Sequence, residues 1–351
     1  MALVALVGAL CGLALLVPSL IAVEFPRVLS PRTRWVALGH LMSLIALSIS
    51  FILGLIGMIR IERSGGRITG RAFAVAAILL TMLGGLLPIW LIIARRPRSV
   101  AFRMVCGTNL SGIGKAMLIY SNDYDDQFPR AGGRESTWAQ KIPDWTATSR
   151  FAAYGVSASG EGGIGTISSC LYLLVKYSEA TPKSFICTKD KGITEFKPSR
   201  SRRRHLDLID FWDFGPEPWK HYSFSYHMPF GEYALTTSYL PGVAVAADRN
   251  PWMASPFARA RDFSKFDPDG EWEATKAGNT IGHHGDGQNV LFMDSHVGFE
   301  KTSFCGVNDD NIYTYWDGED IRRGAPPVLG SQPQSRTDSM LVHDPPPTKA
   351  K

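Results

Sequence analysis

Residues 72–129 read AFAVAAILLTMLGGLLPIWLIIARRPRSVAFRMVCGTNLSGIGKAMLIYSNDYDDQFP. The part from Ala72 to Ala94 carries no charge and is long enough, as a helix, to cross a hydrocarbon layer of about 30 Å. Beyond a basic cluster, apolar residues return every three or four positions, at Phe102, Cys106, Leu110, Ile113, Met117 and Tyr120. That spacing is typical of one buried face of an amphipathic helix. The stretch therefore predicts a membrane helix that leads into the spine helix of a water-soluble head.

Two further apolar stretches, Ala2–Val23 and Trp35–Ile59, come before it. The first has neither the basic n-region nor the clear cleavage site of a secretory signal, so it is interpreted as a retained helix. The domain prediction is a membrane domain over 1–98, a head over 99–323 and a tail over 324–351, with transmembrane helices at about 2–23, 35–59 and 72–94. The tail is rich in Pro, Ser and Gln and lacks hydrophobic periodicity, which predicts disorder.

The charge is divided unevenly along the chain. Up to Arg98 there are ten Arg, no Lys, two Glu and no Asp, a net charge of +8, whereas the remainder has 27 basic and 30 acidic residues, a net charge of −3. A head without basic excess cannot neutralise many phosphates, so nucleic acid is not expected as a partner. The basic excess flanks the apolar stretches, where the lipid bilayer is the expected partner.

Two sequence features disagree about the side of the membrane on which the head lies. The loop between the second and third apolar stretches has four arginines, and the opposite side has seven: Arg27, Arg32, Arg34, Arg95, Arg96, Arg98 and Arg103. Counting alone places the head in the cytoplasm. The head also has four cysteines, an even number suited to two disulfides and therefore to an oxidising compartment: Cys106, Cys170, Cys187 and Cys305. Their pairing cannot be deduced from the sequence, and the lack of C-x-x-C spacing makes a zinc site unexpected.

Several segments of the head are similar to a known family. In chain order they are Cys106–Leu110, Tyr120–Asp123, Pro182–Cys187, Ala246–Pro251 and His284–Val297. Together they resemble the bacterial prepilin-like proteins (type IV pilin-like or pseudopilin-like) with a His-x9-Asp-Gly C-terminal motif, represented here by His284, Asn289 and Asp294. Ser295 stands where that motif has Gly. Upstream, residues 35–89 resemble a two-helix membrane domain of unknown function.

The resemblance implies a fold, a location and a class of function. Pilin-like helices run from the cytoplasmic side outward, which places the head outside the bacterial cytoplasmic (inner) membrane, on a multi-pass anchor. The implied function is that of a non-enzymatic structural or interaction protein, with other envelope or secretion proteins as partners. A pseudopilin subunit of a secretion system is an alternative, although the nearest candidate cleavage site, near Gly70, lies behind two expected membrane spans instead of a short basic leader and lacks the Glu at the fifth position after it.

The residues of the head predict an α+β fold, in which the spine helix packs on an antiparallel sheet. Asn289–Met293 and His296–Glu300 are short apolar runs separated by Asp294 and Ser295, the length of a two-residue hairpin turn. Further strands are expected at Phe185–Cys187, His221–Tyr226 and Gly242–Ala247, and a short helix at Cys170–Tyr177.

The candidate chemistry lies in the same motif. The residues that could gather around a metal ion are His283, His284, Asp286, Asp294 and His296. A metal-dependent hydrolase that uses His284, Asp294 and His296 is therefore an alternative function. A two-residue hairpin does not by itself make these side chains converge, so we interpret them as structural polar residues and expect no catalytic residue.

The acidic loop after the spine helix is a second candidate metal site. Asp123 and Asp125 alternate with other residues and have the oxygen ligands that Ca²⁺ prefers, and some pseudopilins use calcium. The loop does not match the twelve-residue EF-hand pattern, so a solvated turn is the first interpretation and no cofactor is expected. Serine and cysteine nucleophile motifs, phosphate loops and dinucleotide fingerprints are missing from the sequence, which favours a protein that is not an enzyme.

Overall fold

The computed structural model describes residues 2–7, 9–11, 33–65, 69–190, 192–198, 206–283 and 285–347, with backbone alone at 33–42, 44, 85 and 87–99. The chain divides into two compact units, Met1–Arg98 and Ser99–Lys351. Helix α3 (Arg71–Asp123) contributes to both units.

The first unit is helical. It contains α2 (Thr33–Arg63) and the beginning of α3, and Gly54 of α2 lets Ile78 of α3 approach closely. Within the described residues, one helix, Ile45–Arg63, is long and apolar enough to cross a membrane. Residues 12–32 and the side chains of residues 85 and 87–94 lie outside the described part of the chain, so the spans expected at 2–23 and 72–94 stay predictions.

Beyond Arg98, the spine helix packs as its spacing predicts from Cys106 onward, whereas Phe102 is only half-buried. Cys106, Leu110, Ile113, Met117 and Tyr120 are all buried in the principal core of the second unit. Gly114 of this helix faces the sheet, and a Cβ there would lie 2.8 Å from Leu291 Cδ1. The glycine therefore allows a close approach of helix and sheet that any larger residue would prevent.

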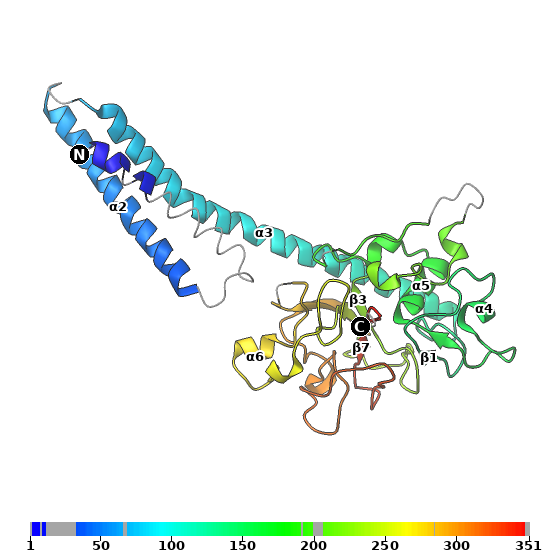
Figure 1. The fold of residues 1–351 in the computed structure, drawn as a ribbon. Coiled ribbons are helices and arrows are strands. Elements are labelled where there is room, and N and C mark those ends of the chain that lie inside the picture. The colour runs from blue at the N-terminus through cyan, green and yellow to red at the C-terminus, as the bar shows by residue number, and fades with distance from the viewer. Residues whose placement is uncertain are drawn as a thin grey trace. The chain divides into compact units, whose positions relative to one another are not determined.

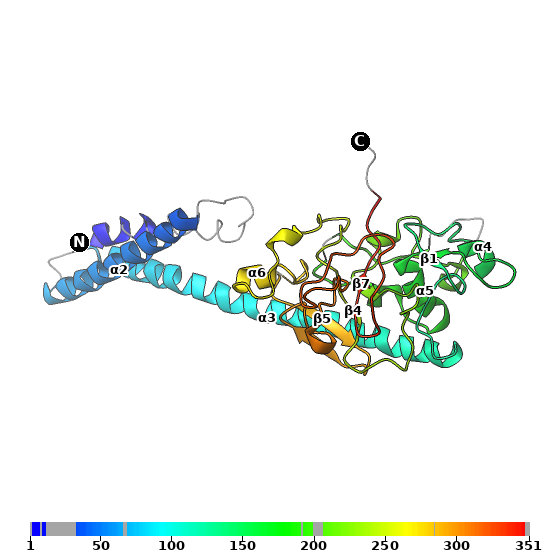
Figure 2. The ribbon, with the colours of Figure 1, turned by 90° about the horizontal axis from the view of Figure 1, so that it is seen from below.

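The second unit is built around a five-stranded antiparallel sheet (Figures 1 and 2) with the strand order β6-β5-β4-β3-β7. The strands are β3 (Phe224–His227), β4 (Ala244–Asp248), β5 (Gln288–Phe292), β6 (Val297–Glu300) and β7 (Leu341–Val342). The predicted hairpin is confirmed: β5 pairs with β6 from Gln288↔Glu300 to Leu291↔Val297. Its loop has three residues, Met293, Asp294 and Ser295, instead of the expected two, and Ser295 has a φ of 70°, the left-handed conformation that the third residue of such a loop adopts. The α+β class is confirmed at this level.

Short helices and a small parallel pair surround the sheet. They are β1 (Thr137–Trp138), β2 (Ile164–Gly165), α4 (Arg150–Tyr154), α5 (Ile167–Tyr177), α6 (Trp272–Lys276), and the 3-10 turns η1 (Pro182–Phe185), η2 (Leu208–Asp210), η3 (Pro218–Lys220), η4 (Phe263–Lys265) and η5 (Val307–Asp309). Helix α5 confirms the helix expected at 170–177 and begins with a capping box between Thr166 and Ser169. The strand expected at Phe185–Cys187 is wrong, because Pro182 starts a 3-10 turn that ends at Phe185.

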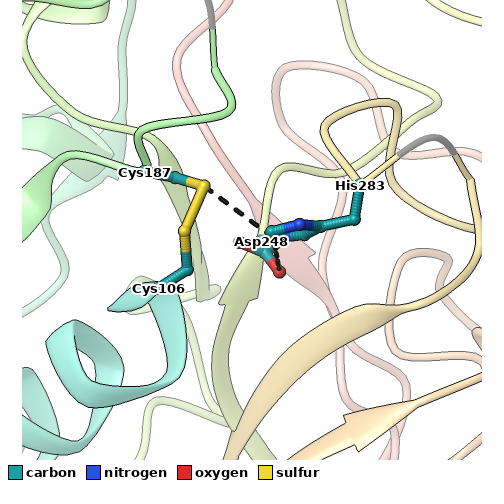
Figure 3. Close-up of side chains that lie close together, drawn as sticks. All are labelled: Cys106, Cys187, Asp248 and His283. Atoms are coloured by element: carbon teal, nitrogen blue, oxygen red, sulfur yellow. Dashed lines mark hydrogen bonds and ion pairs between the residues drawn. A yellow bond between two sulfur atoms is a disulfide. The ribbon is translucent and has the colours of Figure 1, made fainter. Parts of the chain in front are cut away.

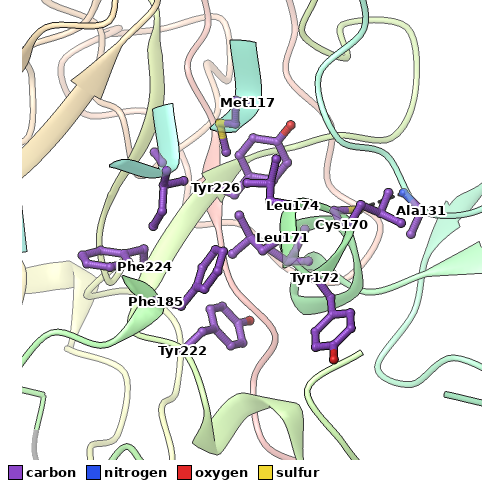
Figure 4. Packing of buried hydrophobic residues seen from close by; sticks show 14 of the residues in the cluster. Met117, Ala131, Cys170, Leu171, Tyr172, Leu174, Phe185, Tyr222, Phe224 and Tyr226 are labelled. Atoms are coloured by element: carbon purple, nitrogen blue, oxygen red, sulfur yellow. Dashed lines mark hydrogen bonds between the residues drawn. The ribbon is translucent and has the colours of Figure 1, made fainter. Parts of the chain in front are cut away.

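Aromatic side chains fill the core between α5, the spine helix and the sheet (Figure 4). Leu171 and Leu174 of α5 and Met117 of the spine helix are buried in it together with Tyr226 of β3. The buried Tyr226 hydroxyl donates a hydrogen bond to the Pro129 carbonyl at 3.2 Å. The core therefore excludes water without leaving this polar group unpaired.

The C-terminal segment corrects one expectation. Residues 324–347 are ordered rather than disordered, and β7 pairs with β3 at Tyr226↔Val342 and His227↔Leu341. Asp344 is fully buried and accepts hydrogen bonds from the backbone N–H groups of Ile167 (2.9 Å) and Ser168 (2.7 Å) at the start of α5. A two-residue strand within a proline-rich context has no periodicity to reveal it, which is why composition suggested disorder.

Candidate functional site

A buried cluster of four chemically active side chains lies where the spine helix meets the sheet (Figure 3). Cys106 belongs to α3, Cys187 follows η1, Asp248 ends β4, and His283 precedes β5. Cys106 and Cys187 form a disulfide with a Cα–Cα distance of 5.2 Å, although 81 positions separate them in the sequence. All four side chains are buried.

Hydrogen bonds to backbone carbonyls hold the segment before Cys187 against the spine helix and the sheet. The Asn109 side-chain amide, one helical turn beyond Cys106, donates to the Ile186 carbonyl at 2.9 Å. The Ser223 N–H donates to the Phe185 carbonyl at 2.8 Å, so the segment before Cys187 is also hydrogen-bonded to the residue that precedes β3. The disulfide thus covalently fixes a segment that already lies against the spine helix.

Asp248 and His283 form the polar half of the cluster. Asp248 Oδ2 accepts hydrogen bonds from the Asn289 backbone N–H at 2.7 Å and from the Asn289 side-chain amide at 2.9 Å, and it lies 3.2 Å from His283 Nε2. The same Nε2 lies 3.8 Å from Cys187 Sγ. The other carboxylate oxygen, Oδ1 of Asp248, is buried and has no hydrogen-bond partner among the described residues. One nitrogen, one sulfur and one carboxylate therefore face a common point.

The edge of the cluster is charged and less buried. Arg103, one turn before the disulfide on α3, donates to Asp286 Oδ2 at 2.9 Å, and its guanidinium lies 4.3 Å from the centre of the Phe299 ring. Lys276 Nζ lies 3.3 Å from the other oxygen of Asp286. Asp286, one of the candidate metal ligands, therefore pairs with two cations. The Phe299 ring also meets His283 edge-on, with ring centres 6.0 Å apart, and covers the site.

Among the described residues, the candidate metal ligands of the motif do not form one cluster, and His284 lies outside the described part of the chain. Asp294 and His296 occur at the exposed tip of the β5–β6 hairpin, where Asp294 Oδ1 and His296 Nδ1 are 2.5 Å apart. The hydrogen bond from His296 lowers the pKa of Asp294. Across the described part of the chain, the group with ligand atoms close enough to share a metal ion is Cys106, Cys187, Asp248 and His283. The length of β5 keeps the hairpin tip away from that group.

The expectation of two disulfides is also corrected. Cys170 and Cys305 are free. Cys170 is buried in the principal core, where its sulfur accepts a hydrogen bond from the Ala131 N–H at 3.2 Å and burial raises the pKa of the thiol. Cys305 packs against a second hydrophobic cluster that includes Phe266 and Phe292, and it therefore cannot meet Cys170.

Among the described residues, the acidic loop does not form a group of three or more ligand atoms close enough to share a metal ion. Asp123 and Asp125 are exposed and line a cavity of about 420 Å³, together with three arginines, Arg130, Arg134 and Arg150. Asp125 has a φ of 51°, which is typical of a tight turn. Because the nearby guanidinium groups repel cations, the arrangement supports a solvated turn over a calcium site.

Asp248 is the functional residue that sequence reasoning missed. It lies in the segment Ala246–Pro251 that carries the family resemblance, and it directly ends the buried run of β4. An acidic residue at the end of a fully apolar strand is a signal for a buried, paired carboxylate, since a lone charge there would be too costly. The motif spacing selected His284, which lies outside the described residues, and its neighbour His283 is a member of the cluster.

Comparisons of the chain with protein-family models, with curated proteins and with solved structures give no match.

Proposed function

We propose that this chain is a membrane-anchored, non-enzymatic, pilin-like structural or interaction protein whose head lies outside the bacterial cytoplasmic membrane. The observation that carries the proposal is the buried Cys106–Cys187 disulfide, which joins the spine helix to the body of the head. Disulfides form and persist in oxidising compartments and are rare in the cytoplasm. This supports an outward head in spite of the arginine count.

Two features of the fold support the remaining parts of the proposal. The apolar helix Ile45–Arg63 has the length and composition of a membrane anchor. In the head, the last turns of α3 pack on an antiparallel sheet through Cys106, Leu110 and Ile113, an arrangement in keeping with the pilin-like resemblance.

The burial of the polar cluster favours a structural role over a hydrolase. The side chains of His283 and Asp248 are only 2% and 4% exposed, so a substrate has no access to them. Asp294 and His296 are accessible, but two ligands at a hairpin tip do not make a catalytic metal site, which takes three protein ligands and an open position.

The side of the membrane can be tested with the full-length protein in its native membrane. A reporter enzyme that is active only outside the cytoplasm is fused after Arg71 or after Lys351. The second position keeps β7 intact, whereas a fusion near residue 320 would remove it from the sheet. We expect activity only from the fusion after Lys351. The reverse pattern would place the head in the cytoplasm and contradict the proposal.

Mass spectrometry of the same membranes without reductant gives an independent check. We expect a peptide pair linked through Cys106 and Cys187, and an N-terminus upstream of Gly70. An N-terminus at Arg71 would instead favour the pseudopilin alternative, because that is where a prepilin peptidase would cut.

A further inference from the structure

We propose that the reduced chain binds one zinc ion through Cys106, Cys187, Asp248 and His283, and that the disulfide and the zinc ion are alternative states of one site. The inference goes beyond the proposed function, since it requires neither a pilin-like identity nor a particular side of the membrane. It begins from the observation that one ligand atom of each residue lies within 4.8 Å of the others.

The distances suit tetrahedral zinc. Bonds of about 2.3 Å to sulfur and about 2.0–2.1 Å to nitrogen or oxygen place neighbouring ligand atoms roughly 3.3–3.8 Å apart. His283 Nε2 lies 3.2 Å from Asp248 Oδ2 and 3.8 Å from Cys187 Sγ. These two ligand-to-ligand distances are therefore already close to those that zinc needs. Cleavage of the disulfide frees the two sulfurs to separate to about 3.8 Å.

The donor set selects the metal. Two thiolates and an imidazole favour zinc over the hard cations Ca²⁺ and Mg²⁺, which prefer oxygen ligands. Four protein ligands in a buried position make a closed, structural site rather than a catalytic one.

A second shell is also present. The backbone and side-chain amides of Asn289 both donate to Asp248 and fix its orientation, as outer-shell groups do around bound metals. A Cβ at Gly107, the neighbour of Cys106, would lie 3.2 Å from Asn289 Oδ1, so the glycine leaves room for this amide. The unpartnered Oδ1 of Asp248 is a buried acceptor that the disulfide state leaves unused.

The disulfide state and the zinc-bound state interconvert through thiol–disulfide exchange and zinc binding. A small dithiol reduces the protein disulfide: the Cys106–Cys187 S–S bond breaks, the dithiol becomes a disulfide, and its two hydrogens end on the protein thiols. Zinc then binds both sulfurs as thiolates and the two thiol protons leave to solvent. In the reverse direction, a disulfide oxidant takes two electrons from the thiolates, the S–S bond forms again, and zinc is released.

The test uses full-length, metal-free protein in detergent, in its disulfide form or reduced with dithiothreitol that is then removed by gel filtration without oxygen. Each sample is equilibrated with Zn²⁺, desalted and subjected to elemental analysis. We expect one zinc per chain in the reduced protein and none in the disulfide form. Equal zinc in both forms, or none in the reduced form, would overturn the proposal.

Variants identify the ligands. Cys187→Ser and His283→Ala should each weaken zinc binding by about 100-fold or more, whereas the double variant Cys170→Ser/Cys305→Ser should leave it unchanged. Retention of full zinc affinity by Cys187→Ser would contradict the site, and far-ultraviolet circular dichroism shows whether each variant is folded.

Cobalt supplies a measurement on the unaltered protein. Tetrahedral Co²⁺ with thiolate ligands gives a sulfur-to-metal charge-transfer band together with visible ligand-field bands. We expect both in the reduced chain, with a charge-transfer intensity of two thiolates, and loss of both when the disulfide is restored. A cobalt spectrum without charge transfer would overturn the assignment of the cysteines. None of these results depends on membrane topology, so the zinc site and the proposed function can fail separately.

Discussion

Two histidine–aspartate pairs occur near the β5–β6 hairpin, and they differ mainly in burial. His296 and Asp294 are 2.5 Å apart at the hairpin tip, with side chains 55% and 45% exposed. His283 and Asp248 are 3.2 Å apart, just before β5 and at the end of β4, with side chains 2% and 4% exposed. The shorter contact is the weaker one, because water competes for exposed ion pairs and reduces them to about 0–1 kcal/mol. Removal of one partner from a buried pair costs about 3–5 kcal/mol.

The two pairs show that the residues of a sequence motif are not the same as the buried residues that stabilise the fold. Asp294 belongs to the recognised motif and is solvated. Asp248 lies outside that motif, yet at the end of β4 it accepts two hydrogen bonds from Asn289 and contacts His283. Four predictions test this contrast, from the largest expected effect to the smallest.

Removal of the disulfide next to the buried pair should have the largest effect on stability. Replacement of both Cys106 and Cys187 by Ser should lower the free energy of unfolding by about 4 kcal/mol, because the bridge closes a long loop in the unfolded chain. Urea unfolding of the purified protein without reductant measures this loss. Cys305→Ser, at a free cysteine, is the control and should cost about 1 kcal/mol or less. Equal losses in both variants would mean that the bridge does not stabilise the head.

The pairs themselves come next. Asp248→Ala should cost about 3 kcal/mol, since it leaves a buried histidine and two Asn289 donors without their acceptor. Asp294→Ala removes a carboxylate in the same hairpin region and should change stability by about 0.5 kcal/mol or less. Both are read from urea unfolding at pH 7. A cost for Asp294→Ala that matches the cost for Asp248→Ala would refute the importance of burial.

A buried carboxyl without a cationic partner should make stability depend on pH. Burial, and then the neighbouring Asp344, raise the pKa of Asp213 to about 8, from an ordinary value of 3.8. The folded state therefore holds this proton more tightly than the unfolded state. Its contribution is complete below about pH 4 and is lost as pH rises through about 8. Between pH 6 and 8 the free energy of unfolding should fall by roughly 2 kcal/mol.

Asp213→Asn is the matched variant, because it keeps the size of the side chain and cannot ionise. Its stability should fall less than that of the wild-type protein over the same pH range. Parallel curves would show that Asp213 is already ionised at pH 6, stabilised by the hydroxyl groups of Thr166 and Ser168.

The hairpin tip should give the smallest effect, and with the opposite sign. Ser295 has a φ of 70°, where glycine is favoured, so Ser295→Gly should stabilise the head by about 0.5–1 kcal/mol. The control is Ser159→Gly, at an exposed serine without a positive φ, which should not stabilise. A thermal melt resolves the difference. If Ser295→Gly is neutral or destabilising, the turn is not under backbone strain.

The parts of the head that were predictable have strong local signals. In the spine helix, apolar residues recur every three or four positions, and in the β5–β6 hairpin two apolar runs flank a short turn. Both are encoded by residues close in sequence, so periodicity reveals them. Strand β7 has two residues and pairs with β3, which lies more than a hundred positions earlier in the chain. No local sequence pattern therefore predicts it.

The candidate site was only half predictable for the same reason. Motif spacing pointed to His284, and spacing alone does not show that His283 contacts Asp248. Composition gave an even number of cysteines, whereas the pairing depends on how η1 places Cys187 beside the spine helix. Asp248 gained its role from the sheet, which brings β4 next to β5.

The position of Asp344 has a consequence for the order in which the head is made. During synthesis, α5 emerges well before the carboxylate that binds its first N–H groups, across a separation of 177 positions at Ile167. Until that late segment is available, the start of the helix and the open edge of β3 lack their partners. The core of the head therefore stays incomplete until the segment that contains Asp344 has been synthesised.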